Sequence, residues 1–218
     1  MLSNRTDELK KSLVEYTSHI ENMISISIKG LLKKNGDVLD KILDMEDTAN
    51  RYEVDIEDDC ITIIAQFQPM AKDLRSILTI LKMSNDLERM GDHAVNLSQH
   101  SSYIIDKEPI KPFIDLPRMA DLTIDMVKNS INSFLKENAA LADQVLQSDN
   151  AVDDLRDKIV RELIECMIDD SRTIERALHL IEIARNLERI ADLATNIAED
   201  TIYVVRGKNI KHNIEQDD

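Results

Sequence analysis

The sequence has few of the residues that end helices or build sheets. Its 218 residues include four glycines, four prolines, no tryptophan and only 3% aromatic residues. Leu, Ile, Met, Glu, Asp, Lys and Arg dominate instead, a composition that favours long helices over strands. A hydrophobic share of 43% excludes a disordered chain and is enough, at this length, to bury a core. The composition therefore predicts an all-α fold.

Cysteines and long apolar runs are also scarce. Cys60 and Cys166 are the only cysteines, and no Cys-x-x-Cys or Cys/His pattern joins them. Each lies in an apolar run, so we expect two buried thiols in a reducing compartment. No segment approaches the ~20 apolar residues that span a bilayer, and no apolar leader follows Met1. We expect a cytoplasmic protein that meets a membrane only through partners.

The charge balance is strongly one-sided. Basic residues number 27 against 42 acidic ones, for a net charge of −15. Such a chain is a poor ligand for nucleic-acid phosphates and is repelled by anionic membrane surfaces. Cations and basic protein surfaces suit it better as partners. An acidic surface that only keeps the protein soluble explains the net charge equally well.

One segment occurs twice. Residues 87–96, Leu-Glu-Arg-Met-Gly-Asp-His-Ala-Val-Asn, return at 187–196 as Leu-Glu-Arg-Ile-Ala-Asp-Leu-Ala-Thr-Asn, with six of ten positions identical. The identical positions include the Glu, Arg and Asp of the window and the Asn one turn further on. Such a match within one chain indicates a duplicated unit.

Proline and glycine mark the limits of that unit. Three of the four prolines fall in residues 106–117, which cannot continue a helix, so we divide the chain into domains 1–107 and 108–218. Apolar periodicity predicts helices at about 7–34, 37–66, 69–105, 116–136, 138–167 and 171–205. Pro69 suits a first helical turn, Asp170 or Ser171 suits a cap, and Gly207 suits a helix end. The prediction is six helices forming two pseudo-symmetric antiparallel three-helix bundles.

The repeated acids lie away from the predicted core. At roughly 100° per residue, Glu88, Asp92 and Asn96 fall about half a turn from the apolar stripe of their helix, as do their copies. Two acids at this spacing repel each other by roughly 0.2–0.5 kcal/mol. A solvated polar face is one interpretation, and a cation site is the other, because cation binding explains why the repulsion is repeated. The preceding helices carry acids at the same spacing, so each hairpin can gather four carboxylates. The candidate metal ligands are Glu53, Glu57, Glu88, Asp92, Asp149, Asp153, Glu188 and Asp192.

The residue types narrow the choice of metal. Carboxylates without a convergent His or Cys favour hard cations such as Mg, Ca, Mn or Fe and disfavour zinc. His93 adjoins Asp92, but its counterpart is Leu193, so we interpret it as a surface histidine. Arg89 and Arg189 repeat too, and neutralising the acids, bridging two of them or contacting a partner all remain open roles.

These segments together resemble the PhoU family, phosphate-uptake regulators of bacteria and archaea. The resemblance rests on residues 87–96 and their copy, on Gln-Phe-Gln-Pro-Met-Ala-Lys-Asp-Leu-Arg at 66–75 and on Tyr-Val-Val-Arg-Gly at 203–207. It covers nearly the whole chain and implies multinuclear metal clusters on the four acid pairs. Iron is the first expectation, with manganese, magnesium, calcium or zinc as alternatives. Glu57 stands where Asp is expected, and Ala191 and Leu193 depart from the first copy, which puts the second metal site in doubt.

The resemblance also implies a function. It describes a negative regulator of phosphate uptake and of the phosphate-starvation response, acting as an adaptor between the ATPase subunit of the phosphate ABC transporter and a sensor histidine kinase. A metal-dependent phosphohydrolase and a purely structural bundle are the alternatives. Against the enzyme, the sequence offers no nucleophile beside a base and no glycine-rich phosphate loop. A homodimer remains open, since no exposed apolar stripe identifies an interface.

Overall fold

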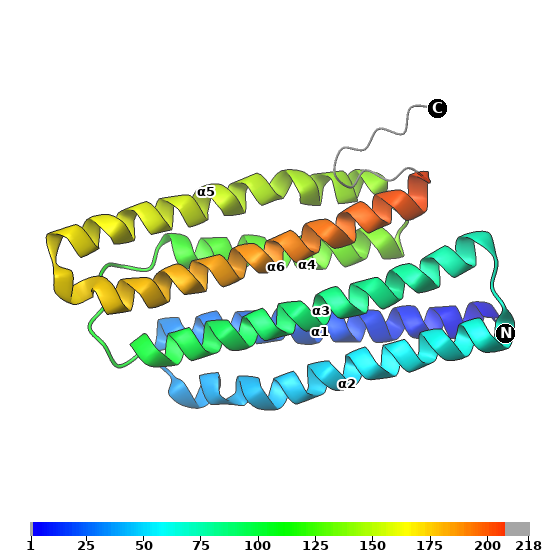
Figure 1. Cartoon of the computed structure of the whole chain (residues 1–218), viewed down its shortest axis with the longest axis horizontal. Helices are drawn as coiled ribbons and strands as arrows, with labels where there is room; N and C mark the ends of the chain where they lie inside the picture. Colours follow the sequence, from blue (N-terminus) through cyan, green and yellow to red (C-terminus); the bar gives the residue numbers. More distant parts are fainter. Residues whose placement is uncertain (1, 208–218) are drawn as a thin grey trace.

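The computed structural model describes residues 2–207 and contains, in that range, six long helices and no strand (Figure 1). The helices are α1 (Leu2–Lys33), α2 (Gly36–Phe67), α3 (Ala71–Ile104), α4 (Asp115–Leu135), α5 (Ala139–Asp169) and α6 (Ile174–Arg206), with a short 3-10 turn η1 (Ser171–Thr173) before α6. Helices α1–α3 pack together, as do α4–α6, and α3 packs on α6 between the two groups. The all-α prediction of two antiparallel three-helix bundles is confirmed.

Local sequence explains where most helices begin and end. Asn35 and Asn138 cap α2 and α5, because each side chain accepts a hydrogen bond from a backbone N–H of the first turn. Gly207 ends α6 in the left-handed conformation at φ 70°, as predicted. Asp170 accepts from the backbone N–H of Arg172 and caps η1, so the predicted cap is also present.

Two predicted helix starts are wrong. The first helix begins at Leu2 rather than near Asp7. Pro69 lies before α3 rather than in its first turn, because Gln68 adopts a left-handed conformation at φ 46° that closes α2, and Met70 remains extended. The proline thus belongs to the turn and not to the helix.

The proline-rich segment separates α3 from α4 as expected. Residues 105–114 form turns and irregular structure, and α4 starts at Asp115 with Pro117 in its first turn. Of the two cysteines, Cys60 is buried, as predicted, but Cys166 is only half-buried. Cys166 lies one turn from the end of α5, at the edge of the core. None of the helices between residues 2 and 207 combines the length and apolar content needed to cross a bilayer.

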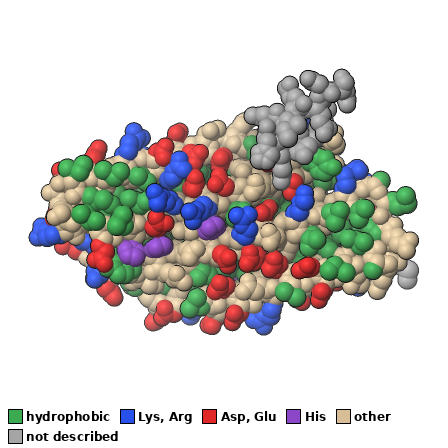
Figure 2. All heavy atoms as spheres, in the orientation of Figure 1, with side chains coloured by type: hydrophobic (Ala, Val, Ile, Leu, Met, Phe, Trp, Pro, Cys, Tyr) green, Lys and Arg blue, Asp and Glu red, His purple; other side chains and the backbone are tan. Residues whose placement is uncertain are grey.

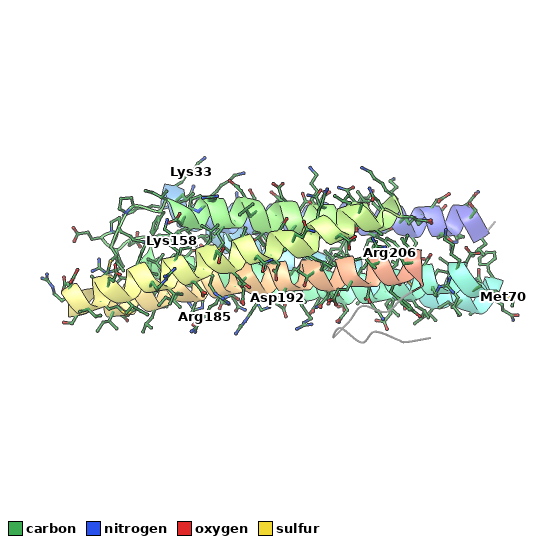
Figure 3. All side chains as sticks on the ribbon, turned by 90° about the horizontal axis from the view of Figure 1, so that it is seen from above. Lys33, Met70, Lys158, Arg185, Asp192 and Arg206 are labelled. Carbon is green, nitrogen blue, oxygen red and sulfur yellow. The ribbon has the colours of Figure 1, made fainter. Side chains whose placement is uncertain are left out.

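The α3–α6 contact joins the two halves, and we call it the seam. His93 Nδ1 lies 2.9 Å from Asn186 Oδ1, and His100 Nδ1 lies 2.9 Å from His179 Nδ1. From the first contact to the second, the residue number rises by seven on α3 and falls by seven on α6. The two helices therefore run antiparallel. Their hairpin turns accordingly lie at opposite ends of the molecule, and Met70 marks one end in Figure 3.

Candidate metal centre

The second half gathers the four carboxylates that the sequence predicted. Asp149 and Asp153 of α5 face Glu188 and Asp192 of α6, and we call these four the second acidic cluster. Burial, and after it the negative charges of Asp192, Asp153 and Glu188 in that order, raise the pKa of Asp149 to about 6. Asp149 Oδ1 is buried without a hydrogen-bond partner in the described structure. A buried carboxylate oxygen that has no donor and is repelled by its neighbours is a candidate cation ligand.

The first half gathers a similar but different set. Burial raises the pKa of Glu88, and the charges of Asp92, Glu53 and Glu46 add to it. The pKa of Glu46 is likewise raised by its burial and then by the charge of Asp92. We call Glu46, Glu53, Glu88 and Asp92 the first acidic cluster. Glu46 was missed by the sequence analysis, although it lies one heptad before Glu53 on the same helix.

Glu57 does not join this cluster. It is exposed on α2 and lines a surface cleft of about 470 Å³ with Lys82, Asp86 and Asp200, where Glu53 also reaches. The Glu57 charge contributes to raising the pKa of the Cys60 thiol, which burial raises most, and it is not among the charges that shift Glu88. The structure therefore brings seven of the eight predicted ligands into two clusters and leaves Glu57 outside them.

The buried faces of α2 and α5 explain the difference. The buried positions of α2 and α5 correspond: in five pairs, adding 103 to the number of a buried α2 residue gives the number of a buried α5 residue. The matched pairs are Leu39 and Ala142, Ile42 and Val145, Ala49 and Val152, Ile56 and Ile159, and Cys60 and Leu163. Glu46 is then the structural counterpart of Asp149, Asn50 that of Asp153, and Glu53 that of Arg156. The first acids of the two predicted pairs, Glu53 and Asp149, are therefore one heptad out of register with each other.

Arg156 gives the second acidic cluster an internal cation. Its Nη1 lies 2.7 Å from Glu188 Oε1, its Nη2 lies 3.4 Å from Asp153 Oδ1, and its Nε lies 3.0 Å from Asp157 Oδ1. The Arg156 side chain is 26% exposed and that of Glu188 is 20% exposed, so this contact is poorly solvated. The first cluster has a carboxylate, Glu53, at the matching position. The two clusters therefore differ in net charge.

A buried phenol adjoins the first acidic cluster. Tyr16 of α1 is fully buried, and its hydroxyl has no hydrogen-bond partner in the described structure. Burial raises the pKa of this hydroxyl, and the charges of Glu53, Glu88 and Asp92 raise it further. Its ring stacks on Tyr52 of α2 at 5.3 Å between centroids. No periodic signal in the sequence distinguishes Tyr16 from an ordinary core residue.

The donor chemistry suits a hard cation, but the side chains as placed do not form a complete ligand set. Across residues 2–207, no three His, Cys, Asp or Glu side chains converge closely enough to hold a metal ion. All eight members of the two clusters are carboxylates, and oxygen ligands of this kind hold hard cations. Binding would require the carboxylates to rotate inward. A bound cation would offset the repulsion at Glu88 and would give the unpaired Asp149 Oδ1 a partner.

The seam histidines differ from the sequence interpretation. His93 is half-buried rather than a surface residue, because its ring bonds Asn186 of the other half. Burial lowers the pKa of His93 most, and the charges of Arg189 and Arg89 lower it further, whereas the hydrogen bond to Asn186 and the charge of Asp92 raise it. His179 contacts His100 and stacks on the Tyr103 ring at 3.9 Å between centroids. A contact between the two halves produces no recognisable pattern in the sequence of either half, so the sequence analysis could not predict it.

The fold and the paired acidic clusters define a duplicated helical-bundle protein with a carboxylate-rich surface on each half. The PhoU domain model matches residues 13–100 and 116–201. The chain belongs to the PhoU family.

Known relatives agree with this assignment over nearly their whole length. The phosphate-specific transport system accessory protein PhoU homolog of Aquifex aeolicus is 37% identical over 97% of this chain and 96% of its own. A homolog from Thermotoga maritima is 30% identical over 97% of this chain and 90% of its own. The crystal structure of PhoU from Pseudomonas aeruginosa superposes with a TM-score of 0.90 at 31% identity, covering 95% of this chain and all of that one.

Proposed function

We propose that this protein is a regulatory adaptor of phosphate transport. In this proposal it negatively regulates phosphate uptake and phosphate-starvation signalling by contacting the ATPase subunit of the phosphate ABC transporter and a sensor histidine kinase. The relatives' names as phosphate-specific transport system accessory proteins support the link to transport. Two clefts, of about 470 and 540 Å³, lie open on the surface, which suits contact with macromolecules better than enclosure of a substrate.

The observation that carries the proposal is the pair of acidic clusters, one on each bundle. Each holds four carboxylates, and in each the pKa values of some members are raised by burial and by the charges of the others: Glu46 and Glu88 in the first cluster, and Asp149, Glu188 and Asp192 in the second. We propose that both clusters bind metal, with iron first and manganese, magnesium, calcium or zinc as alternatives. A bound cation would supply positive charge that neutralises the clusters and would fix the relative positions of α2 and α3, and of α5 and α6. The protein would remain in the cytoplasm and reach the membrane through its partners.

Arg156 makes the clusters unequal in this scheme. A guanidinium that already pairs with Glu188 and Asp153 competes with a metal for the same oxygens. The first acidic cluster, where Glu53 replaces that arginine, should therefore hold metal more tightly than the second. This replaces the sequence-based doubt about the second site with a physical cause.

Elemental analysis tests the metal. Purified protein should carry metal that is reduced in Glu88→Ala/Asp92→Ala and, to a lesser extent, in Glu188→Ala/Asp192→Ala. Glu57→Ala is the matched control, because Glu57 is an acid on the same face of α2 as Glu53 but stands outside the cluster. Equal metal content in all four proteins would remove the metal from the proposal and leave the adaptor.

A binding assay tests the adaptor. The full-length protein is immobilised and probed with the transporter ATPase and with the cytoplasmic part of the kinase. The proposal requires that at least one binds, and that deleting the gene raises expression of phosphate-starvation genes in high phosphate. Phosphatase turnover that disappears in the Glu88→Ala/Asp92→Ala variant, without partner binding, would instead support a metal-dependent phosphohydrolase.

A further inference from the structure

The repeated arginines meet at the seam. Counting four residues back from His93 reaches Arg89, and counting four forward from Asn186, its partner, reaches Ile190. The antiparallel register therefore places Arg89 beside the Arg189 position, near the middle of both helices. Duplication has turned one surface arginine into a pair drawn from the two halves.

An open cleft connects these two side chains. Its volume is about 540 Å³, and its polar lining consists of Arg89, His93, Arg189, Asp192, Thr195 and Asn196. Figure 2 shows Lys and Arg side chains gathered along the middle of this face, with Asp and Glu on both sides. The cleft thus concentrates positive charge on a chain whose net charge is −15.

Neither arginine has an ion-pair partner closer than 4.0 Å among residues 2–207. Arg89 Nη1 lies 4.0 Å from Asp86 Oδ1, at the outer limit of an ion pair, and its side chain is 56% exposed. Arg189 is exposed and forms no ion pair within 4.0 Å with any residue from 2 to 207. By contrast, Arg206 at the end of the same helix lies 2.6 Å from Asp143. Both guanidinium groups line the same cleft, where Asp192 is the one carboxylate among the described lining residues, and a bound anion would offset the remaining positive charge.

The third member of the cleft is held in a fixed orientation. Asn186 Nδ2 donates to the Glu182 backbone oxygen at 2.8 Å, so its Oδ1 faces His93. Asn186 Oδ1 can only accept, and His93 Nδ1–H must therefore donate across the 2.9 Å contact. This leaves His93 Nε2 as the ring nitrogen available to a ligand.

We propose that this cleft binds the inorganic hydrogen phosphate ion between Arg89 and Arg189. Guanidinium groups match the oxygens of a tetrahedral oxyanion in geometry and in charge. The two arginines come from opposite bundles, so the ion is bound only while α3 and α6 keep their register. Phosphate binding therefore depends on the contact between the bundles. The cleft is larger than one such ion, so water completes the contacts.

Asp192 gives the cleft a preference among oxyanions. A carboxylate repels sulfate, which has no hydrogen at neutral pH, but it can accept a hydrogen bond from the protonated oxygen of hydrogen phosphate. Asp192 lines the cleft together with the two arginines. The site should therefore bind phosphate in preference to sulfate, whereas a simple attraction of anions to arginine would show no preference for phosphate.

This inference goes beyond the adaptor and concerns the metal-free protein, in which Asp192 is available to the cleft rather than to a metal ion. The experiment measures binding of radiolabelled inorganic phosphate to the full-length protein by equilibrium dialysis, at low ionic strength because salt screens exposed charges. Metal is first removed with EDTA, so that phosphate cannot bind a metal ion instead. The Glu88→Ala/Asp92→Ala variant should bind phosphate like the wild type even if it loses metal, which separates this test from that of the proposed function.

The arginine variants decide the outcome. Arg89→Gln and Arg189→Gln should each weaken phosphate binding about tenfold or more, since charge-assisted hydrogen bonds are the strongest of their kind. Arg185→Gln is the matched control, because Arg185 lies one turn away on α6 but pairs with Glu182 outside the cleft. Sulfate should compete poorly, and Asp192→Asn should bring sulfate and phosphate closer in affinity.

Three results would overturn the proposal. Phosphate binding that is absent from the wild type excludes the site. Binding that the Arg185 control weakens as much as the other two variants shows a diffuse charge effect. Undiminished phosphate binding in both variants assigns the arginines to another role, such as contact with an acidic protein surface.

Discussion

Arg156 occupies on α5 the position that Glu53 occupies on α2. The two helices bury matching residues at a shift of 103, and both side chains face the glutamate that the repeat preserves, Glu188 and Glu88. One half thus neutralises part of its acidic cluster internally, and the other does not. This exchange of charge at one position predicts different responses of the two bundles to metal.

Replacing Arg156 with Gln should destabilise the metal-free protein and increase its response to metal. The ion pair with Glu188 is mostly buried, and its loss leaves the second cluster with uncompensated repulsion, at a cost of about 1–3 kcal/mol. Chemical denaturation in EDTA measures this loss, and added Mn²⁺ should restore more stability to the variant than to the wild type. Arg185→Gln, which breaks an exposed pair on α6, serves as control and should change stability little. Equal effects of the two variants would contradict the importance of Arg156.

Asp149 should make metal-free protein less stable at neutral pH. Its pKa is about 6 in the folded protein against an ordinary value of 3.8, so the folded state binds a proton more readily than the unfolded state. The penalty is complete above pH 6 and disappears as the pH falls towards 3.8. Asp149→Asn should therefore stabilise the EDTA-treated protein at pH 7 by on the order of 1 kcal/mol, after allowance for solvent screening, and little at pH 4.

The control for this measurement is Asp154→Asn, which removes an exposed acid from the same helix. Urea denaturation of both variants and the wild type at pH 7 and pH 4 gives the comparison. If Asp149→Asn destabilises at pH 7 in EDTA, the Asp149 carboxylate is paired in a way that this structure does not show.

The sequence predicts the fold well because the relevant signals are local. Apolar periodicity and proline locate the six helices, and duplication locates the pair Glu88 and Glu188. It fails where heptad spacing makes two registers look alike, which is why Glu57 was chosen and Glu46 was missed. Contacts between the halves, such as that of His93 with Asn186, depend on packing that no local pattern records.

Two glycines should respond in opposite ways to the same substitution. A Cβ added at Gly30 would lie 2.5 Å from Leu39 Cδ2 and 2.8 Å from its Cγ, and Leu39 is buried. Gly30→Ala should destabilise by about 1–3 kcal/mol, because overpacking exceeds the gain in helix propensity. At Gly91 the nearest atom is Ile20 Cδ1 at 3.3 Å, and the second half already has Ala191 at this position.

Gly91→Ala should therefore be neutral or stabilising by up to about 1 kcal/mol. Urea denaturation of the two single variants tests both statements together. A destabilising Gly91→Ala would show that Ile20 cannot move by the few tenths of an ångström required.

The histidine pair at the seam should make contact between the bundles sensitive to mild acid. His100 Nδ1 and His179 Nδ1 lie 2.9 Å apart, so one proton can be shared between them in a hydrogen bond. Protonating both rings would place two positive charges next to each other. Burial lowers the pKa of His179 below 6.5, and the charge of His100 lowers it further, while Glu175 and Glu182 act in the opposite direction. A histidine with a lowered folded-state pKa loses stability as the pH falls through 6.5 towards that lowered value.

His100→Gln should accordingly reduce the loss of stability between pH 7.5 and pH 5.5. The measurement is the difference in Tm between the two pH values, compared with the same difference for the wild type and for His19→Gln. His19 bonds the Met45 carbonyl within the first bundle and has no contact with the seam, so its variant should behave like the wild type. If His100→Gln and His19→Gln show the same pH dependence, the histidine pair does not make the contact between the bundles sensitive to acid, and the packing of α3 on α6 and of α1 on α4 holds the bundles together without it.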